Sequence, residues 1–242
     1  IQVTQKRESE LRFEMLLAQI NPHFLFNTLN MIACTAKLED AVDTEKMILS
    51  LGNLFRYNLK TREQTVTLDR ELKIVNDYMY LQKMRFGSRI KYRLSLETDA
   101  ADVIIPSLSL QPLVENAVVH GVENATWDCF LYVSGEITDG MAVFTVKDDG
   151  VGMSQEQLEK LMGTEEEPDH EAERTHTHLG VYAVRKRLDY VYQNKARMSI
   201  TSEPGKGTQV ILEIPMNGNV GVTYRKYDET VNENNKKRGD ER

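Results

Sequence analysis

Few residues in this sequence suggest a disulfide, a metal cluster or a membrane span. Its 242 residues include only two cysteines, Cys34 and Cys129, which lie far apart and in no metal-like spacing. That usage excludes a disulfide framework and fits a reducing compartment. No run of about 18 apolar residues occurs, so no segment is predicted to span a membrane. The first residues also lack the pattern of a signal peptide.

The charge balance disfavours two further classes of partner. The formal net charge is −7, which argues against binding to nucleic acid or to an anionic membrane surface. A hydrophobic content of 40% and a charged content of 28% are typical of a soluble globular protein. The length allows one large domain or two smaller ones. Because the sequence begins with isoleucine inside a helical pattern, we expect it to be a piece of a longer chain.

The first 60 residues show the periodicity of two helices. In residues 5–35 the apolar positions recur at steps of three and four, as one coiled-coil-like stripe of Phe13, Leu17, Ile20, Phe24 and Met31. After a polar connector at 39–43, a second stripe comprises Ile48, Leu51, Phe55 and Leu59. Two helices with a short connector form an antiparallel hairpin, which cannot bury both apolar faces alone. Two hairpins can do so as a four-helix bundle, so we expect a homodimer.

The pattern changes to mixed α and β after residues 60–67. Thr67 is a suitable N-cap for a following helix. Alternating segments predict strands at residues 90–97, 129–137, 141–148, 196–203 and 208–215, with a hairpin turn at 138–140. Helical stretches lie between them, at about 107–120, 154–162 and 180–194.

These elements predict an α+β protein in which a mixed sheet is covered by helices on one face, a two-layer α/β sandwich. We place a dimerising helical hairpin at residues 1–64 and the sandwich at 65–216. Residues 217–242 are polar and charged with little to bury, and we expect a disordered tail.

The stretch LVENAVVHG, residues 113–121, places Asn116 and His120 on one face of a helix that Gly121 is expected to end. A simple explanation is a helix C-terminus, where the dipole favours histidine and glycine acts as the cap. In the functional alternative, the amide oxygen of Asn116 suits Mg²⁺ and the imidazole of His120 reaches phosphate oxygens.

The stretch KDDGVGMSQEQLEKL, residues 147–161, runs from a strand end at Asp148 through Gly150 and Gly152 into a helix opened by Ser154 and Gln157 as a capping box. An ordinary Asp-Gly turn would explain it. A calcium loop is excluded because acidic residues are missing from its third and fifth positions. A buried aspartate could instead accept a hydrogen bond from an exocyclic amine, with the glycines letting the backbone approach a flat ring.

Two glycine-containing stretches follow, HLGVYAVRKRL at 178–188 and EPGKGTQV at 203–210. Gly180 is expected to precede a helix whose amides could face phosphates. Gly205 and Gly207 flank Lys206 before the last strand, which fits a hairpin turn equally well. Each pattern is weak alone, whereas their order and spacing along the chain are specific.

Taken in order, INPHFLFNTLN, LQPLVENAVVHG, DDGVGM, HLGVYAVRKRL and GKGTQVILEIP resemble the LytS/YesM-type sensor histidine kinases. The C-terminal part is similar to the wider ATP-binding superfamily of gyrase, histidine kinases and MutL. The resemblance covers about residues 10–215. It implies a protein-histidine kinase that uses ATP and Mg²⁺ and passes phosphate to an aspartate of a response regulator. It also implies the cytoplasmic portion of a membrane-anchored bacterial sensor, with the membrane contacted only through a preceding region.

The resemblance also assigns roles to individual residues. His23 corresponds to the phospho-acceptor, Asn116 to the Mg²⁺ ligand, and Asp148 to the aspartate that binds the adenine amino group. The remaining ATP-binding positions that it implies are Glu115, His120, Gly121, Gly150, Gly152, Gly180 as a lid hinge, Gly207 and Thr208. Asn27 lies one helical turn from His23, where it could position water for hydrolysis of phosphohistidine or simply contact solvent.

Several positions depart from the family pattern. The family's second glycine box has G-x-G-L followed by asparagine, whereas this chain has His178, Gly180, Val181 and Ala183, and Val119 replaces a basic residue. An alternative function is therefore a catalytically weak nucleotide-binding scaffold. A gyrase-like ATPase clamp is disfavoured, since no catalytic base lies near Asn116.

The acidic segment from Gly163 to Leu179 contains His170, His176 and His178. A solvated ATP lid explains this composition better than a metal site, because no cysteine or strict ligand spacing supports a metal.

Overall fold

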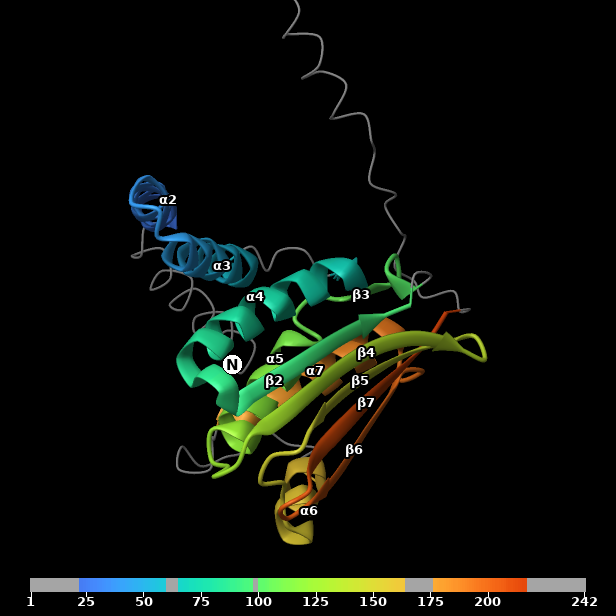
Figure 1. Cartoon of the computed structure of the whole chain (residues 1–242). Coiled ribbons are helices and arrows are strands. Elements are labelled where there is room, and N and C mark those ends of the chain that lie inside the picture. The colour runs from blue at the N-terminus through green and yellow to red at the C-terminus, as the bar shows by residue number, and fades with distance from the viewer. Residues whose placement is uncertain (1–21, 60–64, 98–99, 164–175, 217–242) are drawn as a thin grey trace, which may run out of the picture.

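The computed structural model describes residues 22–59, 65–97, 100–163 and 176–216, with the backbone alone for 176–179 (Figure 1). The predictions for Phe13, Leu17 and Ile20, for the segment around His170 and for the tail at 217–242 lie outside the described residues. Among the described residues, no helix combines the length and the apolar character needed to cross a bilayer.

The hairpin consists of α2, Pro22–Leu38, and α3, Val42–Leu59. Helix α3 lies against α4, Leu68–Phe86, which opens the second part of the chain (Figure 1). Thr67 caps α4 as predicted, because its hydroxyl accepts a hydrogen bond from the Arg70 amide.

The face of α3 that is buried differs from the apolar stripe. Leu54 and Tyr57 are buried, and they form a small cluster with Val66 and Ile74. Members of the predicted stripe do share a face, which a single chain leaves exposed: Leu51, Phe55 and Leu59 retain 36–39% of their accessible surface. On α2, Phe24 and Met31 retain 69% and 64%. These described members of both apolar stripes therefore remain exposed in a single chain.

The predicted mixed sheet is present, with strand order β2-β4-β5-β7-β6. Its strands are β2 Ile90–Leu96, β4 Cys129–Thr138, β5 Met141–Asp148, β6 Arg197–Glu203 and β7 Gly207–Pro215. Strands β2 and β4 are parallel, and the other neighbours are antiparallel. A short pair was not predicted, namely β1 Thr65–Thr67 against β3 Ile104–Pro106.

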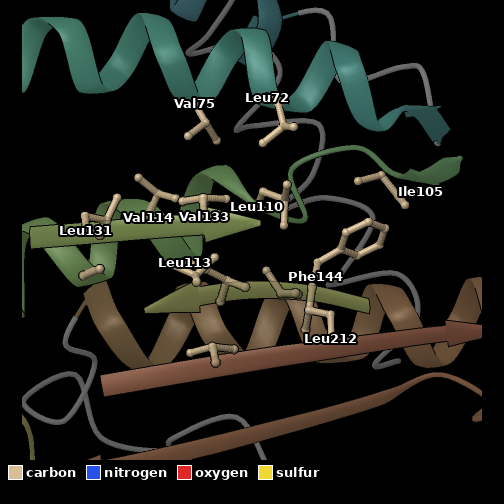
Figure 2. Packing of buried hydrophobic residues seen from close by; sticks show 14 of the residues in the cluster. Leu72, Val75, Ile105, Leu110, Leu113, Val114, Leu131, Val133, Phe144 and Leu212 are labelled. Carbon is tan, nitrogen blue, oxygen red and sulfur yellow. The ribbon is translucent and has the colours of Figure 1, made fainter. Parts of the chain in front are cut away.

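Helices cover one face of this sheet, which confirms the predicted α+β sandwich (Figure 1). They are α4, α5 (Gln111–Asn116) with a π-helical continuation at Ala117–Val122, and α7 (His176–Tyr192). Figure 2 shows Leu72 and Val75 of α4 facing the layer of Leu110 and Val133. Helix α6, Gln155–Gly163, lies at one end of the sheet beside β6, so this end is walled by helices from several parts of the chain.

Candidate nucleotide-binding site

A cavity of about 420 Å³ opens at this end of the sheet, a size typical of small-molecule sites. It lies among β5, β6, β7, the α5 segment, α6 and α7. Its polar lining consists of Asn116, His120, Asn124, Asp148, Gln157, Lys160 and Thr208. Its apolar lining includes Leu113, Val146, Val181, Ile200 and Val210. The cavity thus combines a few polar groups with apolar walls that suit a flat ring.

Asp148 is the buried carboxylate of the cavity, with 3% of its surface exposed. Its Oδ1 accepts a hydrogen bond from the Gly150 amide at 2.9 Å. Burial raises the pKa of Asp148 from 3.8 to about 6, although the backbone hydrogen bonds from Gly150 and Thr208 act in the opposite direction. Asp148 is thus a buried acceptor held by backbone amides, and its burial at the end of β5 was predicted from the sequence.

The backbone segments around Asp148 approach one another closely at glycines. A Cβ on Gly121 would lie 2.6 Å from Asp148 Oδ1, and one on Gly150 would overlap the Gly121 backbone. The Val151 amide donates to the Gly121 carbonyl at 3.2 Å. The expectation that Gly121 ends the helix is wrong, because the segment continues as a π-helix to Val122. Glycine is required there to make room for the carboxylate.

Gly152 and Gly207 have left-handed backbone conformations, with φ of 63° and 90°. A side chain on Gly152 would overlap the Glu203 carbonyl, and one on Gly207 would overlap that of Asp148. Gly152 lines the cavity, and both glycines let neighbouring backbone segments pack closely around it. Thr208 does line it, and its Oγ1 lies 2.9 Å from the hydroxyl of Ser202, which the sequence analysis missed.

Asn116 ends α5 and faces the cavity. Its Nδ2 is buried, and it has no hydrogen-bond partner within the described residues. Rotation of the amide exchanges nitrogen and oxygen, so this position can present a hard oxygen ligand. An orphaned amide in the cavity fits the predicted Mg²⁺ ligand. Glu115, by contrast, does not line the cavity and accepts a hydrogen bond from Gln111 Nε2 at 2.8 Å.

Gly180 lies behind Asn116. A Cβ on this glycine would be 3.2 Å from Asn116 Nδ2 and 3.7 Å from Pro112. Helix α7 begins at His176, so the expectation that Gly180 precedes the helix is wrong. The glycine lets α7 pack closely on α5, and its role as a lid hinge stays a prediction.

The cavity is also lined by three polar residues that were not predicted from the sequence, Asn124, Gln157 and Lys160. Gln157 was assigned to the capping box, and that assignment is confirmed, since the Ser154 amide donates to Gln157 Oε1 at 2.8 Å and the Gln157 amide to the Ser154 hydroxyl at 3.3 Å. Because α6 follows the DDGVGM stretch directly, its cavity-facing residues could have been found from a helical wheel. Asn124 comes one turn after His120, and its amide donates to the His120 carbonyl.

His23 and Asn27 lie outside the cavity, on the exposed surface of α2. The amide nitrogen of Asn27 is 3.3 Å from Nδ1 and 3.4 Å from Nε2 of the imidazole. The predicted placement of the two side chains on one face is therefore confirmed. Helix α2 is described from Pro22 onward. The predicted kink depends on residues outside the described part.

The raised pKa of Asp148 gives a prediction of how the stability of the chain depends on pH. Its pKa of about 6 in the folded chain exceeds the ordinary 3.8, so the folded state retains a proton that the unfolded chain has lost between about pH 4 and 6. The free energy of unfolding therefore falls as the pH rises through this window, by about 1–3 kcal/mol, and the loss persists at higher pH. Asp148→Asn lacks this group. Urea titrations near pH 4.5 and 7 should show the variant gaining stability relative to the unsubstituted chain, and equal pH dependence would contradict the assignment.

Comparisons with known proteins identify two domains in the chain. A model of the histidine kinase family matches residues 11–90, and a model described as histidine kinase-, DNA gyrase B-, and HSP90-like ATPase matches residues 104–218. The sensor histidine kinase YesM of Bacillus subtilis (strain 168) is 34% identical over 214 residues, which are 88% of this chain and 34% of the relative. The sensor protein LytS of the same organism is 32% identical over 216 residues, 89% of this chain and 35% of the relative.

Among solved structures, the histidine kinase domain of the Erythrobacter litoralis EL346 blue-light activated histidine kinase is similar with a TM-score of 0.46 and 15% identity. The likeness covers 81% of this chain and 94% of that one. The chain spans about a third of the length of the YesM and LytS relatives. From the two domain matches and the identity to these relatives, the chain belongs to the LytS/YesM-type sensor histidine kinases, of which it contains the histidine kinase and ATPase domains.

Proposed function

We propose that this chain is the catalytic part of a two-component sensor that uses ATP to phosphorylate His23 and passes the phosphoryl group to an aspartate of a response regulator. The observation that carries the proposal is the buried Asp148 carboxylate in a cavity of about 420 Å³ whose other walls are largely apolar. Such a carboxylate is an acceptor for an exocyclic amine, and the apolar walls exclude water from a bound base.

In this proposal Asp148 accepts a hydrogen bond from the adenine amino group, and Val146, Ile200 and Val210 contact the ring. The backbone contact between Gly121 and Gly150 keeps this end of the cavity in shape. Asn116 and His120 lie on the α5 side and serve the phosphate end of ATP. Asn116 would hold Mg²⁺, and the ion, when bound, offsets negative charge on the phosphates.

His23 is the proposed nucleophile. A ring nitrogen forms the new N–P bond to the γ-phosphorus, while the bond from that phosphorus to the bridging oxygen breaks and ADP leaves. The exposure of His23 on α2 suits a group that has to be reached by an ATP site and then by a regulator. Because His23 does not line the cavity, transfer requires the hairpin and an ATP site to approach each other.

A homodimer would bury the apolar side chains that the hairpin exposes in a single chain. Phe24, Met31 and Phe55 retain between 39% and 69% of their accessible surface in one chain. Pairing two hairpins as a four-helix bundle would bury these side chains. We also propose that the whole protein contacts the membrane through a region outside this sequence, and that its regulator binds the hairpin around His23.

The alternative of a catalytically weak scaffold rests on Val119, His178 and Ala183. The comparisons do not favour it, because the relatives are named as sensor kinases across the matched region. Incubation with labelled ATP separates the two functions, since only a kinase incorporates phosphate.

The first functional prediction concerns the chemistry of the label. A phosphoramidate on imidazole is labile to acid and survives alkali, whereas a serine ester behaves in the opposite way. Label from ATP should therefore be lost in acid, and His23→Gln should incorporate none while still binding ATP. Acid-stable label, or full labelling of His23→Gln, would show that another residue accepts the phosphate.

The second functional prediction concerns Asn27, whose amide lies within 3.4 Å of both ring nitrogens of His23. If it positions water for hydrolysis, Asn27→Ala should still autophosphorylate but should dephosphorylate the regulator more slowly. The two rates are measured separately with purified phosphorylated regulator. An equal loss of both would point to damaged packing of the bundle.

The third functional prediction concerns base selection by Asp148. Asp148→Asn keeps the size but can present a donor to the adenine amine, and an unpaired buried polar group costs about 1–3 kcal/mol. Calorimetric titration should show ATP affinity falling at least about tenfold, and GTP losing its disadvantage.

The adjacent Asp149→Asn is a matched control for this measurement. Asp149 is exposed, accepts from the Phe130 amide at 2.6 Å and does not line the cavity. Its substitution should leave ATP affinity unchanged. Unaltered ATP binding by Asp148→Asn would mean that Asp148 is only a turn residue.

A further inference from the structure

A second buried carboxylate lies outside the nucleotide cavity. Glu71 of α4 has no exposed surface. It accepts hydrogen bonds from the Tyr57 hydroxyl, from the Leu108 amide at 2.7 Å and from the Leu110 amide at 2.9 Å. Three donors converging on one carboxylate satisfy a group that only accepts when ionised. Glu71 does not line the nucleotide cavity, so nucleotide binding there does not explain why this carboxylate is buried.

The three partners come from different parts of the chain. Tyr57 belongs to α3 of the hairpin, whereas Leu108 and Leu110 lie in the loop between β3 and α5. The Leu108 amide also lies 3.2 Å from the Tyr57 hydroxyl, which accepts from it. Burial, followed by the negative charge of Glu71, raises the pKa of Tyr57, which keeps its hydroxyl in the donating form. Glu71 thus joins the hairpin to this loop.

The same loop is held on its other side by α7. Arg187 Nη1 donates to the carbonyls of Ser107 and Leu108 at 2.9 and 2.8 Å. Leu108 has a φ of 58°, a conformation that a leucine adopts only where its surroundings hold it. The loop therefore has a specific, enforced backbone shape, with its amides bound by Glu71 and its carbonyls by Arg187.

The loop leads straight into the nucleotide site. Leu110 is the residue before α5, and α5 ends at Asn116 after six residues. The carbonyl of Leu110 accepts from the Leu113 and Val114 amides at 3.1 and 3.0 Å, so the loop is continuous with the helical hydrogen bonds of α5. A shift of the loop would accordingly move the orphaned amide of Asn116 in the cavity.

We propose that Tyr57 and Glu71 are positioning residues that transmit the placement of the hairpin to Asn116, so that a movement of α3 changes nucleotide binding. The proposal rests on the function proposed above for the cavity. It assigns the buried Tyr57–Glu71 contact a role in coupling the two parts of the chain, beyond holding the fold together.

Tyr57→Phe and Tyr192→Phe form a matched pair for the test. Tyr192 is also buried, and its hydroxyl donates to the Ile104 carbonyl at 2.9 Å, whereas that of Tyr57 donates to Glu71. Both variants lose one buried hydroxyl, so both should show a lower Tm. Hydrogen exchange of the Leu113 and Val114 amides, measured without nucleotide, should become faster by about tenfold only in Tyr57→Phe. Unchanged exchange in Tyr57→Phe, or the same change in both variants, would overturn the proposal.

Nucleotide binding gives the second readout. Calorimetry with ATP should show Kd rising about three- to tenfold in Tyr57→Phe and remaining unchanged in Tyr192→Phe. If the unsubstituted chain binds no ATP, the proposed function fails, and the exchange measurement still decides whether Tyr57 holds α5. If ATP binds and Tyr57→Phe binds it equally well, the coupling fails while the proposed function stands.

A double substitution tests whether α3 affects nucleotide binding through Tyr57. Asp77 of α4 holds α3, because it accepts hydrogen bonds from Ser50 Oγ and Asn53 Nδ2, each at 2.9 Å. Asp77→Ala should loosen α3 and weaken ATP binding in the otherwise unsubstituted chain, but should weaken it little further in Tyr57→Phe. Additive effects of the two substitutions on Kd would show that α3 acts through another contact, and would overturn the proposed route.

Discussion

The packing of backbone against a buried carboxylate at Asp148 shapes the whole nucleotide site. The strand end, the π-helical turn at Gly121 and the loop before β7 meet there, and side chains at Gly121, Gly150 or Gly207 would collide with this carboxylate or with backbone. Because each segment belongs to a different element, the position of the acceptor is determined by the packing of the sheet and helices together. Local substitution at any of these glycines would therefore disturb the cavity as a whole.

The same carboxylate has an energetic cost that a ligand would offset. Burial raises the pKa of Asp148 to about 6, so ionising this carboxyl costs more free energy in the cavity than in water, although the ionised form still predominates at pH 7. A donor placed opposite it would stabilise the ionised form. The selectivity of the site would thus depend in part on the Asp148 carboxylate, because the hydrogen bonds within the protein offset only part of the free-energy cost of burying it.

The hairpin and the ATPase part meet through α3 and α4, and this contact is both apolar and polar. Leu54 and Ile74 pack together, while Tyr57 reaches Glu71 in the interior. His23, in contrast, is exposed on α2, away from the cavity-lining residues. The proposed phosphotransfer needs both a firm connection and an accessible histidine, and the hairpin carries the two near the same end, where Arg56 of α3 lies over the ring of Phe26 of α2.

The sequence alone predicted the strands of the five-stranded sheet, the capping residues Thr67 and Ser154, and the motifs around Asn116 and Asp148, because alternation, capping and turns depend on neighbours a few residues apart. Tertiary structure decided which face of α3 is buried, why Gly121 is glycine and where Glu71 finds its partners. Those features join residues 14 to 39 positions apart for Glu71, and separate elements for Gly121. Their outcome depends on the packing of whole elements, which no local pattern encodes.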